Sequence, residues 1–558
     1  MATTYRTARR IDARGALAAM ILSLTTSASD AKDHFLAVGG GFDPTGNQLS
    51  IETNLLHFQD VLAAVRPDEP AVDIYFADGA AEEPDVQYRD AELEKNCPPA
   101  RRMMAEILGD GESVGLRYRN HRVRDVRGPT DRGLLERRLR ELSRELKSGD
   151  RLIVFAEGHG DEAYGDNDYD YEAGEWVEKP AAEGGEELYN KFDTSYFLWE
   201  RESLAASEFG QWLDRIGRDV TVVLIMGQCY AGGFSHAIFH RNDAELGLSP
   251  HARCGFFAQV HDRPAAGCTP DDEFEEYGSY FWSALGGKSR SGDEAVNADF
   301  DTSGAVSFAE AHAYAIIESG TFDVPVQTSG ALLRRYSRLR GTSGIAPNRE
   351  TPEDNPIKAI FGAIGSATTT PTDEGLLAAT GSLTQFATHA RPWQLAILER
   401  LPKKMGLEPT ATVEAVRLKL SRLKAARGLA DARLGVAAQT LERTQTEAQQ
   451  EVYAIWPELQ QPYSPVAAEL TSERAGEFVD RVHALTSYEA LREARQRVEE
   501  LTKKSFYAQG EQAKAERLLQ TVEEIVLAAN LPKAAPEDVV AKFHAIVRME
   551  EGTLTAGK

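Results

Sequence analysis

Short apolar runs, separated by segments with helical periodicity, constrain the fold of this chain more than any other feature. Each run is continuous rather than alternating, which is typical of strands covered on both faces. Apolar residues also recur at i, i+3 and i+4 from Leu55 to Val65, which predicts a helix between two runs. This pattern predicts an α/β domain with a mostly parallel sheet and helices on both of its faces. The runs lie at residues 35–38, 72–76, 115–118, 152–156, 220–226 and 255–260.

The composition changes near residue 340, where we expect a domain boundary. The α/β pattern occupies residues 32–340, and residues 341–375 are rich in Pro, Gly, Ser and Thr, which is linker composition. Residues 376–558 are rich in Ala, Glu, Gln, Leu and Arg, with a seven-residue apolar repeat from Val413 to Leu441. This region is predicted to be an all-α helical bundle or coiled coil, whose expected role is self-association or partner binding.

Charge and hydropathy exclude some classes of function. A net charge of −25 repels phosphates, so nucleic-acid binding is not expected. No apolar run reaches the roughly 18 residues that a membrane-spanning helix needs. Four arginines between Arg6 and Arg14 precede an uncharged stretch and then small residues, which is the layout of a signal peptide. We therefore expect residues 1–31 to be a signal peptide of an exported protein, the alternative being a cytoplasmic protein that begins with an amphipathic helix.

The cysteines do not form a metal-binding pattern. Cys97, Cys229, Cys254 and Cys268 contain no CxxC pair, so zinc is not indicated. If Cys229 is a nucleophile, Cys254 and Cys268 remain available for a disulfide in an oxidising compartment, but the spacing alone does not decide this.

A histidine and a cysteine each follow a predicted buried strand. His159 lies in LIVFAEGHGD, and Cys229 lies in VTVVLIMGQCYAGGF. Sites in open α/β sheets form beyond the carboxyl ends of the strands, so adjacent strands would bring the two side chains together. Gly160 allows close approach of the backbone to a substrate, and residues 231–233 allow a tight turn. A thiol, an imidazole and backbone donors are what cysteine proteolysis needs.

These segments resemble the caspase-like superfamily of cysteine peptidases, which includes legumains, metacaspases, caspases and gingipains, and most of all its bacterial legumain-family members. The resemblance covers residues 35–340 and rests on a strand with His159-Gly160, followed about seventy residues later by a strand with Cys229. It implies that Cys229 is the nucleophile, that His159 is the general acid and base, and that the amides of Gly160 and Cys229 form the oxyanion hole. Metacaspases bind basic side chains through an Asp two residues before the nucleophile, but Gly227 stands there in this chain. The residue preferred at the cleavage site therefore stays open.

A second motif is the twelve-residue loop DFDTSGAVSFAE, at residues 299–310. Calcium takes six to eight oxygen ligands, which EF-hand loops supply from positions 1, 3, 5, 7, 9 and 12, with Gly at position 6. Gly304 occupies that position. The alternative is a turn that only caps the following helix. The loop resembles an EF-hand and predicts Ca²⁺ bound by Asp299, Asp301, Ser303, the Ala305 carbonyl, Ser307 and Glu310.

The sequence as a whole predicts a cysteine endopeptidase that acts on protein or peptide substrates through an acyl-enzyme. We expect calcium to take part and no organic cofactor to be needed. The alternatives are a catalytically inactive scaffold of the same fold, and a transpeptidase, because an amine can capture the same acyl-enzyme in place of water.

Overall fold

The computed structural model describes residues 31–554 apart from 69, 164–166, 171–174, 179–188, 272–274, 293, 343–348, 351–372 and 462. The expected signal peptide lies outside the described residues except for Ala31, as does most of the expected linker. Within the described ranges, no helix combines the length and apolarity needed to cross a membrane.

A seven-stranded sheet forms the centre of the molecule, in the order β15-β14-β13-β6-β1-β2-β5. Neighbouring strands are parallel except for β14 and β15, which are antiparallel. The predicted mostly parallel sheet is therefore confirmed. The strands are β1 (Asp33–Gly40), β2 (Ala71–Phe76), β5 (Val126–Gly128), β6 (Arg151–Gly158), β13 (Thr221–Met226), β14 (Arg253–Phe257) and β15 (Val326–Gln327).

One predicted strand lies outside this sheet. The run at 115–118 becomes β4 (Leu116–Arg119), which pairs in antiparallel fashion with β3 (Val86–Arg89) in a separate two-stranded ribbon. Its placement among strands buried on both faces was wrong, because Arg117 and Tyr118 are exposed. A strand that carries charged side chains cannot be enclosed by helices on both sides.

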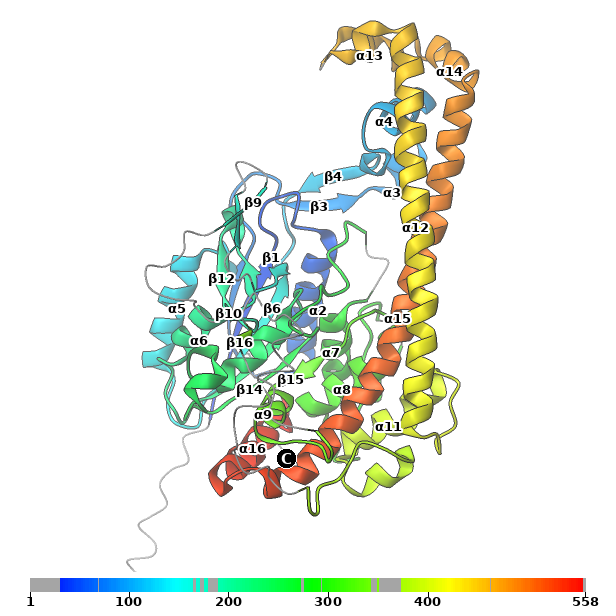
Figure 1. The fold of residues 1–558 in the computed structure, drawn as a ribbon. Helices are drawn as coiled ribbons and strands as arrows, with labels where there is room; N and C mark the ends of the chain where they lie inside the picture. Colours follow the sequence, from blue (N-terminus) through cyan, green and yellow to red (C-terminus); the bar gives the residue numbers. More distant parts are fainter. Residues whose placement is uncertain are drawn as a thin grey trace, which may run out of the picture.

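Helices cover both faces of the sheet, as predicted (Figure 1). Alternate residues of β6 divide between two cores, with Ile153 and Phe155 in one and Val154 and Ala156 in the other. The first core is covered by α2 (Leu49–Val65), α7 (Tyr277–Gly286), α8 (Phe308–Glu318) and α9 (Thr328–Tyr336). The second is covered by α5 (Arg132–Glu145), α6 (Ala206–Leu213) and the 3-10 helix η3 (Ala231–Ile238).

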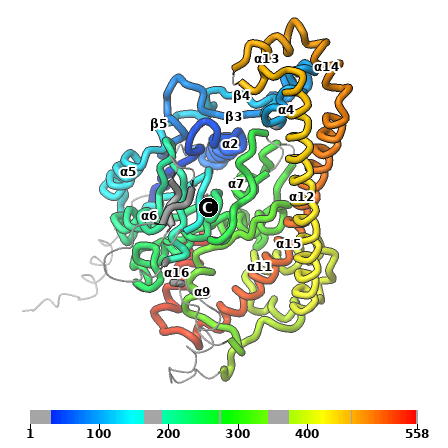
Figure 2. Tube along the Cα trace, turned by 45° about the horizontal axis from the view of Figure 1, so that its top comes forward, coloured from blue at the N-terminus to red at the C-terminus, as the bar shows by residue number. Residues whose placement is uncertain are grey.

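The C-terminal region is helical, also as predicted. Its two long helices run antiparallel, because the Ser487 hydroxyl bonds to Glu451 and the Ser505 hydroxyl bonds to Asp431. Their hairpin extends past the sheet, and its tip lies near α4 (Pro99–Leu108) (Figures 1 and 2). The helices are α11 (Pro392–Lys404), α12 (Val413–Ile455), α13 (Pro465–Leu470), α14 (Ala475–His483), α15 (Thr486–Ala534) and α16 (Glu537–Glu550).

The end of this helical region also completes the core under the sheet. Val522 and Ile525 of α15 and Phe543 of α16 belong to the same apolar cluster as Phe256 of β14. The hairpin tip has a separate small cluster with α4. The helical region is thus divided between a projecting hairpin and a part that is integral to the α/β core.

Candidate active site

His159 and Cys229 lie at the same level beyond the carboxyl edge of the sheet. Strands β6 and β13 are parallel neighbours in which Ala156 pairs with Met226. His159 and Cys229 each follow three residues after one member of this pair. The chain order of the sheet also reverses between β1 and β6, and sites in open α/β sheets form beside such a reversal. The structure therefore brings the two predicted residues to one edge at one height.

Gly160 is fixed between the two segments that carry this pair. It begins β7 (Gly160–Asp161), which pairs with β11 (Ser195–Phe197). A Cβ atom at Gly160 would lie 2.5 Å from the Cys229 carbonyl oxygen and 2.7 Å from that of Ser195, so only glycine fits. The Phe197 amide donates to the His159 carbonyl. This places Gly160 at a non-hydrogen-bonded position of the ladder, with its own amide turned away from β11.

The loop after β1 orients the imidazole of His159. Its Nε2 lies 2.8 Å from the Gly46 carbonyl oxygen and 3.0 Å from Oε1 of Gln48, whose amide nitrogen donates to the Thr45 carbonyl. A carbonyl oxygen only accepts, so Nε2 carries the proton and Nδ1 holds the lone pair. The Phe42 ring packs against the imidazole at 5.3 Å between centroids. Burial lowers the pKa of His159, which keeps the ring neutral with Nδ1 unprotonated.

The thiol of Cys229 is half-buried and protonated at neutral pH. Its Sγ lies 3.8 Å from the Ala265 carbonyl oxygen, to which it donates. Burial raises the pKa of Cys229 to about 11, and the charges of Asp323 and Asp161 act in the same direction. A neutral thiol and a neutral imidazole make a resting pair of low reactivity, because the thiolate is the nucleophilic form.

The turn after Cys229 is strained at an unexpected residue. Tyr230 adopts the left-handed conformation with φ of 55°, and its amide donates to the Arg263 carbonyl at 3.0 Å. The sequence suggested that glycines make this turn. Gly232 instead allows close packing, because a Cβ atom there would lie 2.7 Å from the Gln259 carbonyl oxygen. Left-handed backbone at a non-glycine residue costs about 1–3 kcal/mol and often occurs at functional sites.

Three buried carboxyl groups near the pair were not singled out from the sequence. Glu157, Glu276 and Asp323 are 5%, 2% and 1% exposed. Burial, followed by the charge of Glu276, raises the pKa of Glu157 to about 8. Burial also raises the pKa of Asp323 to about 6. The sequence signal for Glu157 was an acidic residue at the end of an otherwise apolar strand, two positions before His159.

All four cysteines are free thiols. Cys254 lies in the core on β14, while Cys268 is half-buried with its Sγ 3.6 Å from the Gly158 carbonyl oxygen. Burial raises the pKa of Cys268, and the charges of Cys229, Glu157 and Glu276 add to this effect. Cys254 and Cys268 are therefore not joined, and Cys268 lies near the candidate nucleophile.

The loop at 299–310 brings three of its predicted ligands together. Oxygen atoms of Asp299, Asp301 and Glu310 all lie within 4.8 Å of one another. Each carboxylate already accepts hydrogen bonds from the loop backbone. For example, Oε1 of Glu310 accepts the amides of Phe300 and Asp301 at 2.8 and 3.0 Å. The donor set suits a hard cation, and such a cation would take the place of part of this hydrogen bonding.

The remaining predicted ligands take part in local hydrogen bonds. The Ser303 hydroxyl donates to the Ala305 carbonyl oxygen at 3.0 Å. Ser307 caps α8, and its hydroxyl and amide both donate to Oε2 of Glu310. The helix cap, which the sequence offered as the alternative to a calcium loop, is therefore present in the structure.

Helix α7 connects the two sites. At its first turn, a Cβ atom on Gly278 would lie 2.4 Å from Oε2 of Glu157. At its last turn, Leu285 and Gly286 line a cavity of about 290 Å³ together with Asp299 and Gly304 of the loop. One short helix therefore contacts both the residues beside the candidate pair and the loop at 299–310.

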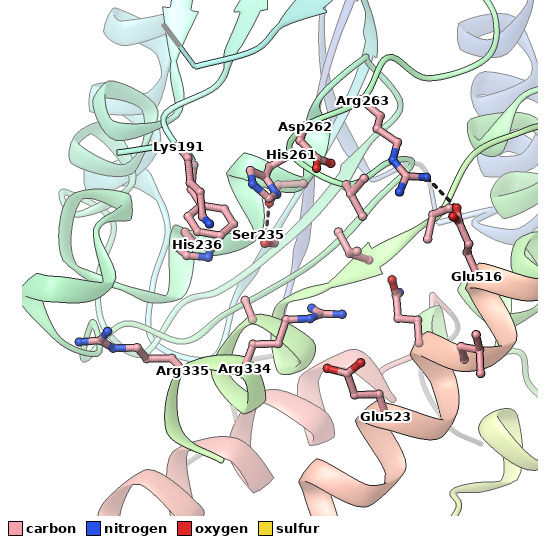
Figure 3. Close-up of a pocket in the computed structure, with 18 of the residues that line it drawn as sticks. Lys191, Ser235, His236, His261, Asp262, Arg263, Arg334, Arg335, Glu516 and Glu523 are labelled. Carbon is pink, nitrogen blue, oxygen red and sulfur yellow. Dashed lines mark hydrogen bonds and ion pairs between the residues drawn. The ribbon is translucent and has the colours of Figure 1, made fainter. Parts of the chain in front are cut away.

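A cavity of about 530 Å³ adjoins the segment that follows Cys229. Gly232 is among its lining residues. His236 lies on one side of it, and Glu516 and Glu523 of α15 lie on the other (Figure 3). Arg263 bridges part of its mouth by an ion pair of 2.7 Å with Glu516. The C-terminal helices thus form one wall of a cavity beside the candidate nucleophile.

Comparison with known proteins does not assign the chain to a family. No family model matches it, and no curated protein matches it. Among solved structures, protein GSU0716 from Geobacter sulfurreducens is 12% identical over 43% of this chain and 77% of that chain, with a TM-score of 0.22. A likeness of this size carries no argument about fold or function.

Proposed function

We propose that this chain is a cysteine endopeptidase of the caspase-like superfamily, with Cys229 as nucleophile and His159 as general acid and base. The observation that carries this proposal is the shared height of the two residues beyond adjacent parallel strands. The close approach of Gly160 to the Cys229 carbonyl oxygen adds support, because it brings the backbones of the two proposed oxyanion-hole residues together.

In the first step, Nδ1 of His159 accepts the thiol proton while Sγ of Cys229 attacks the carbonyl carbon of the substrate. The electron pair of the C=O double bond moves to the oxygen, which the amides of Gly160 and Cys229 would stabilise. The raised pKa of Cys229 and the lowered pKa of His159 oppose this proton transfer in the free enzyme. The pair therefore becomes reactive once substrate is bound.

In the second step, the imidazolium gives its proton to the leaving amine, the C–N bond breaks and a thioester remains on Cys229. His159 then takes a proton from water, which attacks the thioester and releases the new carboxyl terminus and the thiol. Throughout the cycle, Gly46 and Gln48 accept the Nε2 proton, which fixes the ring and favours its charged form.

We also propose that the loop at 299–310 binds Ca²⁺ through the six predicted positions. The support is the cluster of three carboxylates within 4.8 Å and the oxygen chemistry that calcium prefers. A bound cation would hold the loop against the last turn of α7.

The test combines labelling with cleavage. A peptide-based electrophile should modify Cys229, and a peptide library should be cleaved by wild type but not by Cys229→Ala or His159→Ala, with Cys97→Ala as the control thiol. Equal labelling of wild type and Cys229→Ala would contradict the enzymatic proposal. Ligated rather than hydrolysed products in the presence of a peptide amine would indicate a transpeptidase.

A further inference from the structure

Glu157 lies directly beneath the candidate catalytic pair. Residues i and i+2 of a strand face the same side and are about 6.6 Å apart along it. Glu157 is the residue two positions before His159, at the end of β6, and the strand register places it beside Gly227, two residues before Cys229. Its carboxyl group occupies the space that a side chain at position 227 would need.

Two glycines make room for this carboxyl group. A Cβ atom on Gly227 would lie 2.3 Å from Oε2 of Glu157, and one on Gly278 would lie 2.4 Å from the same atom. These contacts come from β13 on one side and from the first turn of α7 on the other. Glu157 therefore projects sideways across its neighbouring strand, into the space below Cys229.

The environment leaves one oxygen of this carboxyl group unpaired. Oε2 of Glu157 has no hydrogen-bond partner within the described part of the chain. The charge of Arg290 and a hydrogen bond with Asn54 act to lower the pKa of Glu157, but burial outweighs them. Arg290 also donates to Oε2 of Glu276 at 3.0 Å and to Oδ1 of Asn54 at 2.8 Å. The charge of Asp323 adds to the negative potential at Glu157. A buried acid in this setting is neutral until a cation reaches it.

Cys268 is electrostatically linked to both this carboxyl group and the candidate nucleophile. Burial raises the pKa of its thiol, and the charges of Cys229 and Glu157 add to this effect. It is half-buried while Glu157 is 5% exposed, and its Sγ donates to the Gly158 carbonyl.

We propose that Glu157 is the specificity-determining residue of the peptidase and that it selects lysine or arginine immediately before the cleaved bond. This inference rests on the proposed function. A long basic side chain carries its charge at the end of a flexible stem, which suits a carboxyl group one strand repeat below the nucleophile. The cation supplies the partner that Oε2 lacks, whereas a neutral or acidic side chain leaves the buried acid unpaired.

The experiment uses the full chain and fluorogenic peptides that differ only in the residue before the cut: Arg, Lys, Asn, Asp or Ala. We expect the wild type to prefer Arg and Lys. Glu157→Gln should lower kcat/KM for those two peptides by about thirtyfold or more, the effect of removing one partner of a buried charge pair. Cleavage of the Ala peptide should change by no more than about threefold. The matched control is Glu162→Gln, which removes an exposed carboxylate nearby.

Gly278→Ala provides an independent variant, because its new Cβ atom would displace the carboxyl group without removing it. We expect the same selective loss for Arg and Lys peptides. An unchanged ranking of the five peptides in Glu157→Gln would overturn the inference, as would a wild-type preference for Asn, Asp or Ala. If Glu157→Gln does not fold, the wild-type ranking decides alone. Absence of both cleavage and Cys229 labelling in the wild type would instead refute the proposed function, and this inference with it.

Discussion

The two ends of helix α7 hold carboxyl groups in opposite conditions. At the first turn, Glu157 is buried with one oxygen unpaired within the described residues, and its pKa is raised to about 8. At the last turn, the loop carboxylates accept nearby N–H and O–H groups, and hydrogen bonding with Ser303 lowers the pKa of Asp301. The first group is held neutral by its surroundings and the second is held charged. A carboxyl group with an unpaired oxygen and a set of hydrogen-bonded carboxylates thus lie at opposite ends of one helix.

Substituting Gly160 beside the candidate pair should mainly lower activity, whereas substituting Gly304 in the loop at 299–310 should mainly lower stability. This is the largest expected difference between the two regions. A Cβ atom at Gly160 overlaps the Cys229 backbone, so Gly160→Ala should displace an oxyanion donor and lower kcat/KM at least about 100-fold. Gly304 has open space around it but a φ of +90°. Gly304→Ala should therefore cost about 1–2 kcal/mol of stability through backbone strain. Peptide cleavage and urea unfolding distinguish the two effects, and a Gly160→Ala enzyme with more than half of wild-type activity would contradict the proposed oxyanion hole.

The pH dependence of stability should separate the two carboxyl environments. The folded pKa of Glu157, about 8, lies above its ordinary value of 4.5. The stability that its neutral form contributes is therefore complete below about pH 4.5 and is lost as the pH rises toward 8. Glu157→Gln should flatten the decline in unfolding free energy between pH 5 and 8, measured by urea denaturation with a calcium chelator.

The matched variant for this measurement is Asp301→Asn. The pKa of Asp301 lies below its ordinary value of 3.8, so its contribution is lost only as the pH falls through the acidic range. Asp301→Asn should leave the slope between pH 5 and 8 as it is in the wild type. Equal slopes for wild type and Glu157→Gln would show that Glu157 titrates normally.

The sequence predicted those parts of the fold that depend on long apolar runs. Strands β6 and β13 are continuous enough to be recognised, but β5 has three residues and β15 has two. Such short strands form because their neighbours offer a free edge, which a local pattern does not encode. The run at 115–118 was misplaced for a different reason, since its pairing with β3 leaves the strand partly exposed.

The sequence could predict which residues form the candidate pair, but not how they are placed relative to one another. His159 and Cys229 follow recognisable strands, but their common height depends on which residues pair across β6 and β13. Glu157 was missed because its meaning depends on Gly227 and Gly278, which are distant in the chain. From the sequence, Gly227 indicated the loss of an acidic group at this position, whereas in the structure it leaves room for the carboxyl group of Glu157.

Calcium should have a smaller effect on stability than these changes at the catalytic edge. At a concentration tenfold above its dissociation constant, a ligand bound only to the folded state adds about 1.4 kcal/mol. Asp301→Asn should abolish this gain, because it removes a predicted ligand whose Oδ1 accepts the Ser303 amide. Asp262→Asn, another exposed acid, should retain the full gain. Thermal unfolding with calcium or chelator measures the difference, and an equal gain in both variants would exclude binding at the loop.

The smallest expected change concerns the orientation of His159. Gln48 is a positioning residue, and Gly46 accepts the same Nε2 proton, so one hydrogen bond survives when Gln48 is removed. A hydrogen bond contributes about 0.5–1.5 kcal/mol, so Gln48→Ala should lower kcat by about two- to tenfold with little change in KM.

The direction of the pH shift distinguishes an effect of Gln48 on the His159 imidazole from a general loss of structure. The loss of an acceptor disfavours the imidazolium, so Gln48→Ala should move the acidic limb of the kcat/KM profile to lower pH. Gln48→Glu places a carboxylate at the same atom and should move that limb to higher pH. Shifts in the same direction for both variants would mean that Gln48 acts on the fold of the loop and not on the histidine.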